Sequence, residues 1–312
     1  MNAPDKPMLI VQTITRAFVN LPHVVSLTDR MTQLIQHART NEEPENLLVL
    51  GESGVGKSRV LQKFRNKYSP VVHPEFTEVP VLYVSVPANG NASALASAML
   101  LALGSPFWDR GKIKDLTFQL HCLLKQCKVK VILLDEVNHL VDKGGIKTHH
   151  YTADWLKVFL DQAGIPIVMA GIPRAMRLLK ANDQLRSRFR EIIYIKPFSV
   201  ANEVETHRFC EVLATFTKMM AGVEVIKLTS GDLPKKMLFA TNGYLRDLRR
   251  LLVRAVEIAF RDGSQKIRLS TLEEAFRQVV YADAPNDRNP FCANFTNTPL
   301  TESDEPFAPR EN

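Results

Sequence analysis

The sequence has few cysteines and no long hydrophobic run. Its 312 residues include four cysteines, whose spacing fits no metal-binding pattern and whose number is too small for a disulfide-rich scaffold. They are Cys122, Cys127, Cys210 and Cys292. No apolar run approaches the roughly 20 residues that cross a bilayer, and the first residues lack the apolar region and cleavage site of a secretory signal. We therefore expect a protein of the reducing cytoplasm that has no membrane partner.

Charge is ordinary in amount but unevenly distributed. Charged residues make up 23% of the chain and hydrophobic residues 45%, as in globular proteins, and the net charge is +7. Residues 283–312 carry six acidic and two basic residues, which leaves −4 there and about +11 on residues 1–282. A basic body with an acidic tail favours a polyanionic partner, nucleic acid before membrane. The alternative is that the basic residues only make the surface soluble and bind no polyanion.

One glycine-rich segment, residues 51–58, separates a short apolar run from a helical pattern. It fills every fixed position of G-x-x-x-x-G-K-[ST]. Gly51 and Gly56 permit positive φ, and with Gly54 they allow backbone N–H groups to approach a polyphosphate. Lys57 can reach the β- and γ-phosphates, and the Ser58 hydroxyl can bind Mg²⁺. The predicted nucleotide-binding residues here are Gly51, Glu52, Ser53, Gly54, Val55, Gly56, Lys57, Ser58 and Arg59.

The rest of the chain predicts an α/β core followed by helices. Further apolar runs at 79–87, 129–137, 165–173 and 191–198 are separated by helix-length segments. This alternation predicts a doubly wound parallel sheet. The pattern then becomes helical, and a proline-containing acidic segment follows. The predicted parts are an N-terminal lead (1–25), a nucleotide-binding core (26–198), a small helical lid (199–281) and a disordered tail (282–312).

Two carboxylates end the apolar run at 129–137, in the sequence VILLDE. Ligands of parallel sheets bind at this end of the strands. Asp135 would bind Mg²⁺ directly or through water, and Glu136 would polarise an attacking water molecule. An Asp-Glu pair that only opens a loop is the alternative, and the complete phosphate loop upstream argues against it. The sequence thus predicts an ATPase that uses ATP and Mg²⁺.

A second basic feature is the segment WDRGKIKD at 108–115. Arg110, Lys112 and Lys114 lie in a glycine-containing stretch beside Trp108, and such residues can follow a phosphate backbone. A solvated loop is an equally good interpretation. Because no base-reading motif is visible, we expect binding of double-stranded DNA to tolerate changes of sequence.

Four segments together resemble the AAA+ ATPases. They are GESGVGKS (51–58), VILLDEVNHL (131–140), DQLRSRF (183–189) and GYLRDLRRLL (243–252). Within this class, the chain resembles the TniB/TnsC-type regulators of DNA transposition in its size, the DEVNHL variant, the AGIP strand end and the arginine-rich box. The AAA+ resemblance covers about residues 26–281 and implies the AAA+ fold, a P-loop core with a helical lid.

The resemblance also implies roles for arginines. Arg188 matches the finger that reaches the γ-phosphate held by a neighbouring subunit, with Arg186 and Arg190 as alternatives. Arg246 matches the second sensor, which contacts the nucleotide of its own subunit. The chain departs from the family where a polar first sensor is expected, because the fourth strand ends in Gly171-Ile172-Pro173. We therefore expect hydrolysis to be slow and to depend on assembly.

The function implied by the resemblance is an ATP-dependent regulator that forms a ring or helical filament on double-stranded DNA. It would direct a transposase to target sites and exchange signals with a target-selector protein. Two alternatives remain open. The chain could instead be a AAA+ helicase loader or DNA-remodelling ATPase, or a nucleotide-gated scaffold that hydrolyses little ATP.

Overall fold

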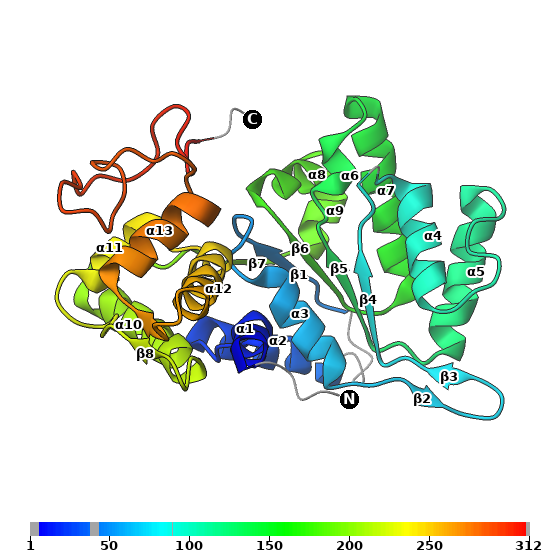
Figure 1. The fold of residues 1–312 in the computed structure, drawn as a ribbon. Helices are drawn as coiled ribbons and strands as arrows, with labels where there is room; N and C mark the ends of the chain where they lie inside the picture. The colour runs from blue at the N-terminus through cyan, green and yellow to red at the C-terminus, as the bar shows by residue number, and fades with distance from the viewer. Residues whose placement is uncertain (1–5, 38–43, 89, 310–312) are drawn as a thin grey trace. The chain divides into compact units, whose positions relative to one another are not determined.

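The computed structural model describes residues 6–37, 44–88 and 90–309 (Figure 1). The described chain divides into two compact units. One is Asn20–Lys196, and the other combines the described residues of Met1–Val19 with those of Pro197–Asn312. None of the described helices is both long enough and apolar enough to cross a membrane.

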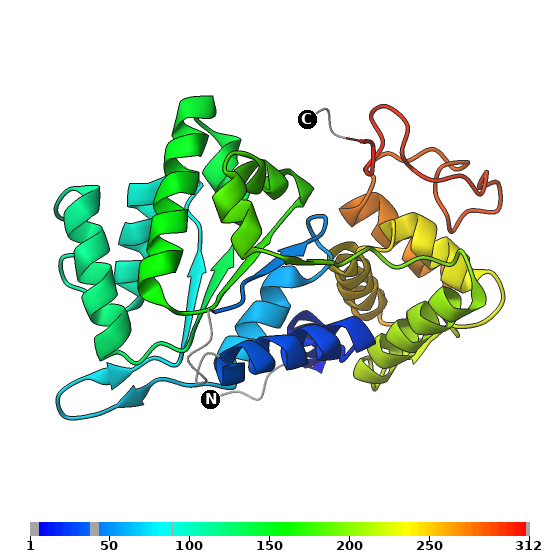
Figure 2. The ribbon, with the colours of Figure 1, turned by 180° about the vertical axis from the view of Figure 1, so that it is seen from behind.

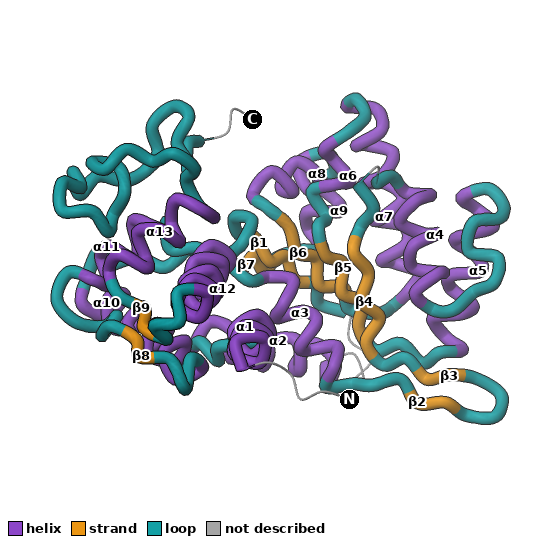
Figure 3. The backbone as a smooth tube through the Cα atoms, in the orientation of Figure 1, coloured by secondary structure: helices purple, strands orange, loops and turns teal. Residues whose placement is uncertain are grey.

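The described residues of Asn20–Lys196 form a five-stranded parallel sheet (Figure 3). Its strands are β1 (Leu47–Leu50), β4 (Val81–Ser85), β5 (Val131–Asp135), β6 (Ile167–Gly171) and β7 (Glu191–Tyr194), in the order β4-β5-β6-β1-β7. β1, β5 and β6 are buried at every position, which is why they appear as continuous apolar runs in the sequence. Because all strands point the same way, the glycine loop after β1 and the carboxylate of Asp135 lie at one edge of the sheet.

Helices cover both faces of this sheet (Figures 1 and 2). On one face, apolar side chains of α4, α5 and α7 pack against the even-numbered positions of β1, β4 and β5. On the other face α3 contacts β4, β5 and β6, and α2 packs against α3. The long helices are α2 (Pro22–His37), α3 (Lys57–Asn66), α4 (Ala92–Ala102), α5 (Ile113–Gln126) and α7 (Ile146–Ala163).

Shorter elements connect these layers. Four short helices lie beyond the ends of β5 and β6, namely α6 (His139–Asp142), the 3₁₀ helix η1 (Pro173–Ala175), α8 (Met176–Lys180) and α9 (Asp183–Arg188). A small antiparallel hairpin, β2 (Val71–Val72) and β3 (Thr77–Glu78), precedes β4. The pair α8 and α9 packs on α7, so that α9 is held beside the sheet before β7 begins.

The second unit is mainly helical. Its elements are α1 (Lys6–Arg16), α10 (Glu203–Met219), β8 (Glu224–Val225), α11 (Leu233–Thr241), α12 (Leu245–Arg261), β9 (Lys266–Ile267) and α13 (Leu269–Val279). Helix α12 contacts α1, α11 and α13. Arg249 of α12 donates to the carbonyl oxygens of Ile14 (3.2 Å) and Ala17 (3.3 Å) at the end of α1. Helix α1 therefore packs within this unit. The predicted fold class, a parallel α/β core followed by a helical part, is confirmed.

The segment after α13 differs from the disordered tail that its composition suggested. Residues 282–309 contain no helix or strand, yet the side chains of Phe291 and Leu300 are only 1% exposed. Arg288 donates to the carboxylate of Glu305 at 2.7 Å, and the ring of Phe295 lies 5.3 Å from that of Phe239 in α11. The aromatic side chains give this segment apolar surface to bury, and that burial offsets its high content of proline and acid.

Candidate nucleotide-binding site

The glycine loop between β1 and α3 has the backbone shape of a phosphate cradle. Gly54 and Gly56 have φ angles of 94° and 108°, a region that favours glycine. Gly51 differs from the prediction, because its φ is not positive. A Cβ atom added at Gly51 would lie 2.4 Å from the carbonyl oxygen of Ile195, so glycine is required there by close approach to the end of β7.

Lys57 is the first residue of α3 and lies inside the loop. Its side chain is 5% exposed, and its Nζ donates to the carbonyl oxygens of Gly51 (2.7 Å) and Glu52 (3.0 Å). A buried ammonium group is costly unless it is hydrogen-bonded, and these two carbonyls satisfy that need. Ser58 follows in the first turn of α3, where backbone N–H groups and the helix dipole favour an anion. The loop thus places a cation, a hydroxyl and a helix N-terminus together.

Asp135 ends β5 and is 1% exposed. Its Oδ1 accepts a hydrogen bond from the backbone N–H of Glu136 at 2.9 Å, and its Oδ2 accepts one from the hydroxyl of Tyr83 at 2.9 Å. Glu136 has a φ angle of 55°, in the left-handed region that residues other than glycine seldom adopt. Such backbone outliers gather at functional sites and cost about 1–3 kcal/mol each. The role of Glu136 stays a prediction.

Tyr83 and Gln62 are two site residues that the sequence analysis missed. The Tyr83 hydroxyl accepts from Nε2 of Gln62 (3.2 Å) while it donates to Asp135. Burial raises the pKa of the Tyr83 hydroxyl to about 12, and the charge of Asp135 adds to the shift. The group therefore stays protonated near neutral pH and remains a donor. The available signal was a single tyrosine within the largely apolar run VPVLYVSVP.

The end of β6 is contacted by a polar side chain from another segment, although residues 171–173 themselves contain no polar side chain. Asn138 is 2% exposed; its Oδ1 accepts from the N–H of Ile172 at 3.3 Å, and its Nδ2 donates to Asp142 at 3.2 Å. Asp142 also pairs with Nε of Arg174 at 2.6 Å. Asn138, which follows β5, thus places a polar side chain beside residues 171–173.

Arg188 is the last residue of α9 and pairs with a carboxylate of its own chain. Its Nε lies 2.9 Å from Oδ1 of Asp161 in α7, and Nζ of Lys157 lies 3.0 Å from the other oxygen. Hydrogen bonds from Arg188 and then Lys157 lower the pKa of Asp161. Arg186 and Arg190, the alternative fingers, are both exposed.

Arg246 lies in the helical unit, as the second residue of α12, and is exposed. The turn before it depends on Gly243, whose φ is 71°. A Cβ atom added at Gly243 would lie 2.1 Å from the carbonyl oxygen of Phe198, and the N–H of Phe198 donates to the Gly243 carbonyl at 2.9 Å. The turn before Arg246 is therefore held against Phe198 of the same unit, and the role of Arg246 stays a prediction.

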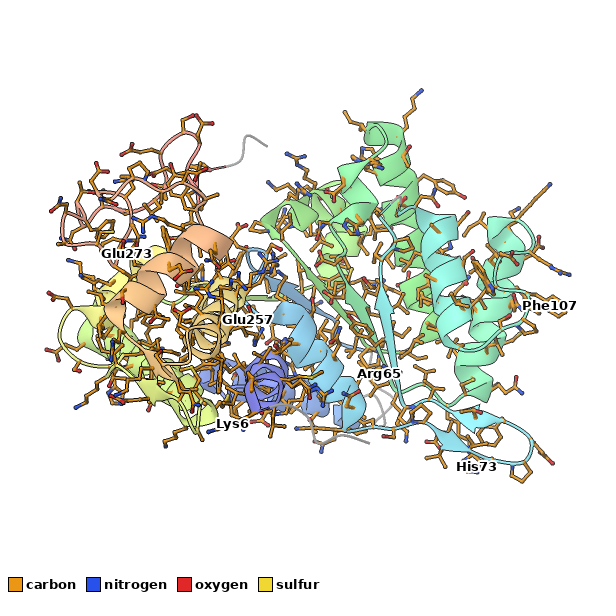
Figure 4. All side chains as sticks on the ribbon, in the orientation of Figure 1. Lys6, Arg65, His73, Phe107, Glu257 and Glu273 are labelled. Atoms are coloured by element: carbon orange, nitrogen blue, oxygen red, sulfur yellow. The ribbon has the colours of Figure 1, made fainter. Side chains whose placement is uncertain are left out.

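The basic segment at 108–115 forms the loop before α5 and the first turn of that helix. Arg110, Lys112 and Lys114 are all exposed. The guanidinium of Arg110 lies 5.3 Å from the ring centre of Phe107, which is 51% exposed and lies at the edge of the α/β unit (Figure 4). Trp108 is 37% exposed. The segment combines cations with aromatic rings on one accessible loop.

The family model described as "Bacterial TniB protein" matches residues 11–198, more than half of the chain. The chain belongs to the TniB family. The predicted resemblance to TniB/TnsC-type AAA+ ATPases is confirmed by this match. The match includes the glycine loop, the β5 carboxylates and the α9 arginines of this TniB-family protein.

Other similarities are to replication proteins. An ORC1-type DNA replication protein of Thermoplasma volcanium is 24% identical over 266 residues, 82% of this chain and 61% of that protein. The chain thus spans about three fifths of that relative's length. The structure of Aeropyrum pernix ORC1 in complex with DNA gives a TM-score of 0.63 at 19% identity, covering 89% of this chain and 70% of the other. That of A. pernix ORC2, in ADPNP–ADP complexes, gives 0.63 at 13% identity, with 86% and 71% covered. At these identities the structural likeness shows the AAA+ fold.

Proposed function

We propose that this protein is an ATPase that hydrolyses ATP to ADP and phosphate and assembles with ATP on double-stranded DNA. The observation that carries the nucleotide-binding part is the buried ammonium of Lys57 inside the glycine loop. The related A. pernix ORC2 was seen in complexes with ADPNP and ADP, which supports ATP as the ligand of this loop.

The residues of the loop and of β5 fit ATP and Mg²⁺. The loop keeps its shape because a side chain at Gly51 would clash with the carbonyl oxygen of Ile195, and Lys57 can exchange its carbonyl partners for β- and γ-phosphate oxygens. Ser58 and Asp135 would hold Mg²⁺, which supplies positive charge at the phosphates. Glu136 would orient the attacking water and take its proton. The remaining loop residues would contact phosphate through backbone N–H groups, and Arg59 would lie beside the nucleotide.

The site is completed in this proposal by a second copy of the chain. Arg188 would contact the γ-phosphate bound by its neighbour, in a ring or a helical filament of subunits. A planar guanidinium is suited to the charge that develops on that phosphoryl group. Arg246 would contact the nucleotide of its own subunit and couple the helical unit to nucleotide state. Hydrolysis is expected to be slow without assembly, because the finger comes from outside the subunit.

DNA is the proposed polyanionic partner. Residues 1–282 carry about +11, and the exposed loop with Arg110, Lys112 and Lys114 offers cations beside aromatic rings. A related protein, A. pernix ORC1, was solved in complex with DNA. Contacts to phosphates carry no sequence information, so binding should tolerate any sequence. A cytoplasmic location is part of this proposal.

The finer role follows from the resemblance to transposition regulators. In this proposal the DNA-bound oligomer directs a transposase to target sites and exchanges signals with a target-selector protein. A second candidate, a helicase loader, is favoured by the similarity to ORC1-type replication proteins. Retention of a purified transposase on the ATP-bound oligomer would support the first role, and retention of a replicative helicase would support the second.

Substitution of Lys57 tests the nucleotide-binding part directly. Lys57→Ala should abolish ATP binding and phosphate release, because the cation that neutralises the phosphates is removed. Lys67→Ala is the matched control, since Lys67 is an exposed lysine at the other end of α3. The measurements are binding of a fluorescent ATP analogue, phosphate release with and without DNA, and thermal unfolding. Normal ATP affinity in a folded Lys57→Ala protein would contradict the proposal.

A further inference from the structure

Tyr83 occupies a position from which its side chain can reach the end of the neighbouring strand. It is the third residue of β4 and is paired with Leu133, whereas Ser85 is paired with Asp135. Side chains two residues apart lie on the same face of a sheet, and α3 contacts β4 and β5. The long ring of Tyr83 therefore runs along the face towards Asp135, where its hydroxyl meets the carboxylate.

The Tyr83 hydroxyl connects the helix of the phosphate loop to the carboxylate at the end of β5. It accepts from Gln62 of α3 at 3.2 Å and donates to Oδ2 of Asp135 at 2.9 Å. The other oxygen of Asp135 accepts from the N–H of Glu136. Each carboxylate oxygen thus has one donor, and each keeps a second lone pair for a metal ion or its water.

A buried carboxylate held in this way has a fixed orientation. Without the Tyr83 hydroxyl, Oδ2 of Asp135, a residue that is only 1% exposed, would lose its donor, and the side chain would turn to find another partner. Hydrogen-bond partners of a metal-binding carboxylate orient it, and their loss typically reduces metal affinity or activity by roughly 10–100-fold.

We propose that Tyr83 is the positioning residue for the metal-binding carboxylate: its hydroxyl, itself held by Gln62, keeps Asp135 oriented to bind Mg²⁺ together with ATP. This inference rests on the proposed function of the site. In this arrangement the Mg²⁺ requirement depends on a contact between α3 and β4 as well as on the residues that touch the cation.

The test measures binding, apart from hydrolysis, in the full chain. The affinity of a fluorescent ATP analogue is determined in EDTA and then across a Mg²⁺ titration, for the parent, Tyr83→Phe and a control, Tyr151→Phe. Tyr151 is an exposed tyrosine of α7, so its loss of a hydroxyl should change nothing. Tyr83→Phe should keep the parent's affinity in EDTA but need roughly tenfold more Mg²⁺ for half of the Mg²⁺-dependent increase.

A second variant keeps the inference testable if Tyr83→Phe does not fold. Gln62→Leu changes an exposed position of α3 and leaves the Tyr83 ring in place. It should shift the Mg²⁺ requirement in the same direction by a smaller factor. Thermal unfolding of each variant is measured in parallel.

The outcomes separate this inference from the proposed function. An unchanged Mg²⁺ requirement in folded Tyr83→Phe overturns the role of Tyr83, while Mg²⁺-dependent binding by the parent leaves the proposed function standing. Equal loss of affinity with and without Mg²⁺ also overturns it, because Tyr83 would then support the loop in general. If Tyr83→Phe does not fold, an unchanged Mg²⁺ requirement in Gln62→Leu overturns it. A parent that binds no ATP overturns both.

Discussion

Removal of the Arg188 guanidinium tests whether the ATP site is shared between subunits. In the single chain, the side chains of Arg188 and Asp161 are 32% and 31% exposed, and an ion pair so exposed contributes about 0–1 kcal/mol to stability. An arginine finger raises the rate by about 10³–10⁵, which equals about 4–7 kcal/mol of transition-state stabilisation. If Arg188 is the finger, exchange of its ion pair with Asp161 for a contact with a neighbour's γ-phosphate is therefore expected to be favourable in the transition state.

Arg188→Ala should consequently lose catalysis and keep its fold. We expect phosphate release at saturating ATP to fall by about 10³–10⁵, with the free energy of unfolding changed by no more than about 1 kcal/mol. ATP affinity of the monomer should stay near that of the parent, because in the proposed arrangement Arg188 contacts the nucleotide of the neighbouring subunit. Arg177→Ala, which removes an exposed arginine of the neighbouring helix α8, is the matched control and should keep the parent's rate.

Mixed oligomers sharpen this test. Arg188→Ala lacks the finger and Glu136→Gln lacks the base, so each protein alone should be inactive. In a mixture, some junctions join an intact Arg188 to an intact Glu136, and activity should return. Absence of recovery across a range of ratios, with co-assembly confirmed, would refute a site shared through Arg188. Arg186 or Arg190 would then be tested as the finger.

Three further predictions concern timing, DNA and pH. Glu136→Gln should retain bound ATP and prolong the lifetime of oligomers on DNA; disassembly at the parent's rate would show that Glu136 does not time release. Joint replacement of Arg110, Lys112 and Lys114 by alanine should reduce the slope of log affinity against log salt by about 3, and an unchanged slope would place the DNA surface elsewhere. Asp161→Asn should be slightly less stable than the parent at neutral pH. The folded-state pKa of Asp161 is lowered from its ordinary 3.8. The difference in unfolding free energy between the two proteins should therefore disappear as the pH falls through the lowered pKa. If urea unfolding shows the same difference below that pH, the result would argue against the ion pair.

The sheet and the phosphate loop were predictable because their signals are local. Parallel strands buried on both faces must be apolar throughout, so β1, β5 and β6 stand out as uninterrupted runs. The fixed spacing of 51–58 reflects a single turn between a strand and a helix. Gly51 shows the limit of this reasoning, since its requirement comes from Ile195, far away in the sequence.

Contacts between distant segments explain what the sequence did not predict. Tyr83 and Asp135 are 52 positions apart, and their contact depends on the register of β4 with β5. Two hydrogen bonds of Arg249 join α12 to the end of α1, 235 and 232 positions earlier in the chain. In the tail, a few aromatic residues outweigh a composition that favours disorder. Each case is decided by packing partners, which local patterns do not specify.

The geometry of β5 also decides which substitution is informative at the catalytic end of the site. One hydrogen bond, from the N–H of Glu136 to Oδ1 of Asp135, orients the carboxylate together with the hydroxyl of Tyr83. A hydrogen bond to a charged group contributes about 1.5–3 kcal/mol. Neutralising Asp135 would weaken both bonds and let its side chain turn, so the loss of activity could not be assigned to metal binding alone. Glu136→Gln leaves the bond in place, because the backbone N–H is unchanged, and it is therefore the substitution that isolates the chemistry of the base.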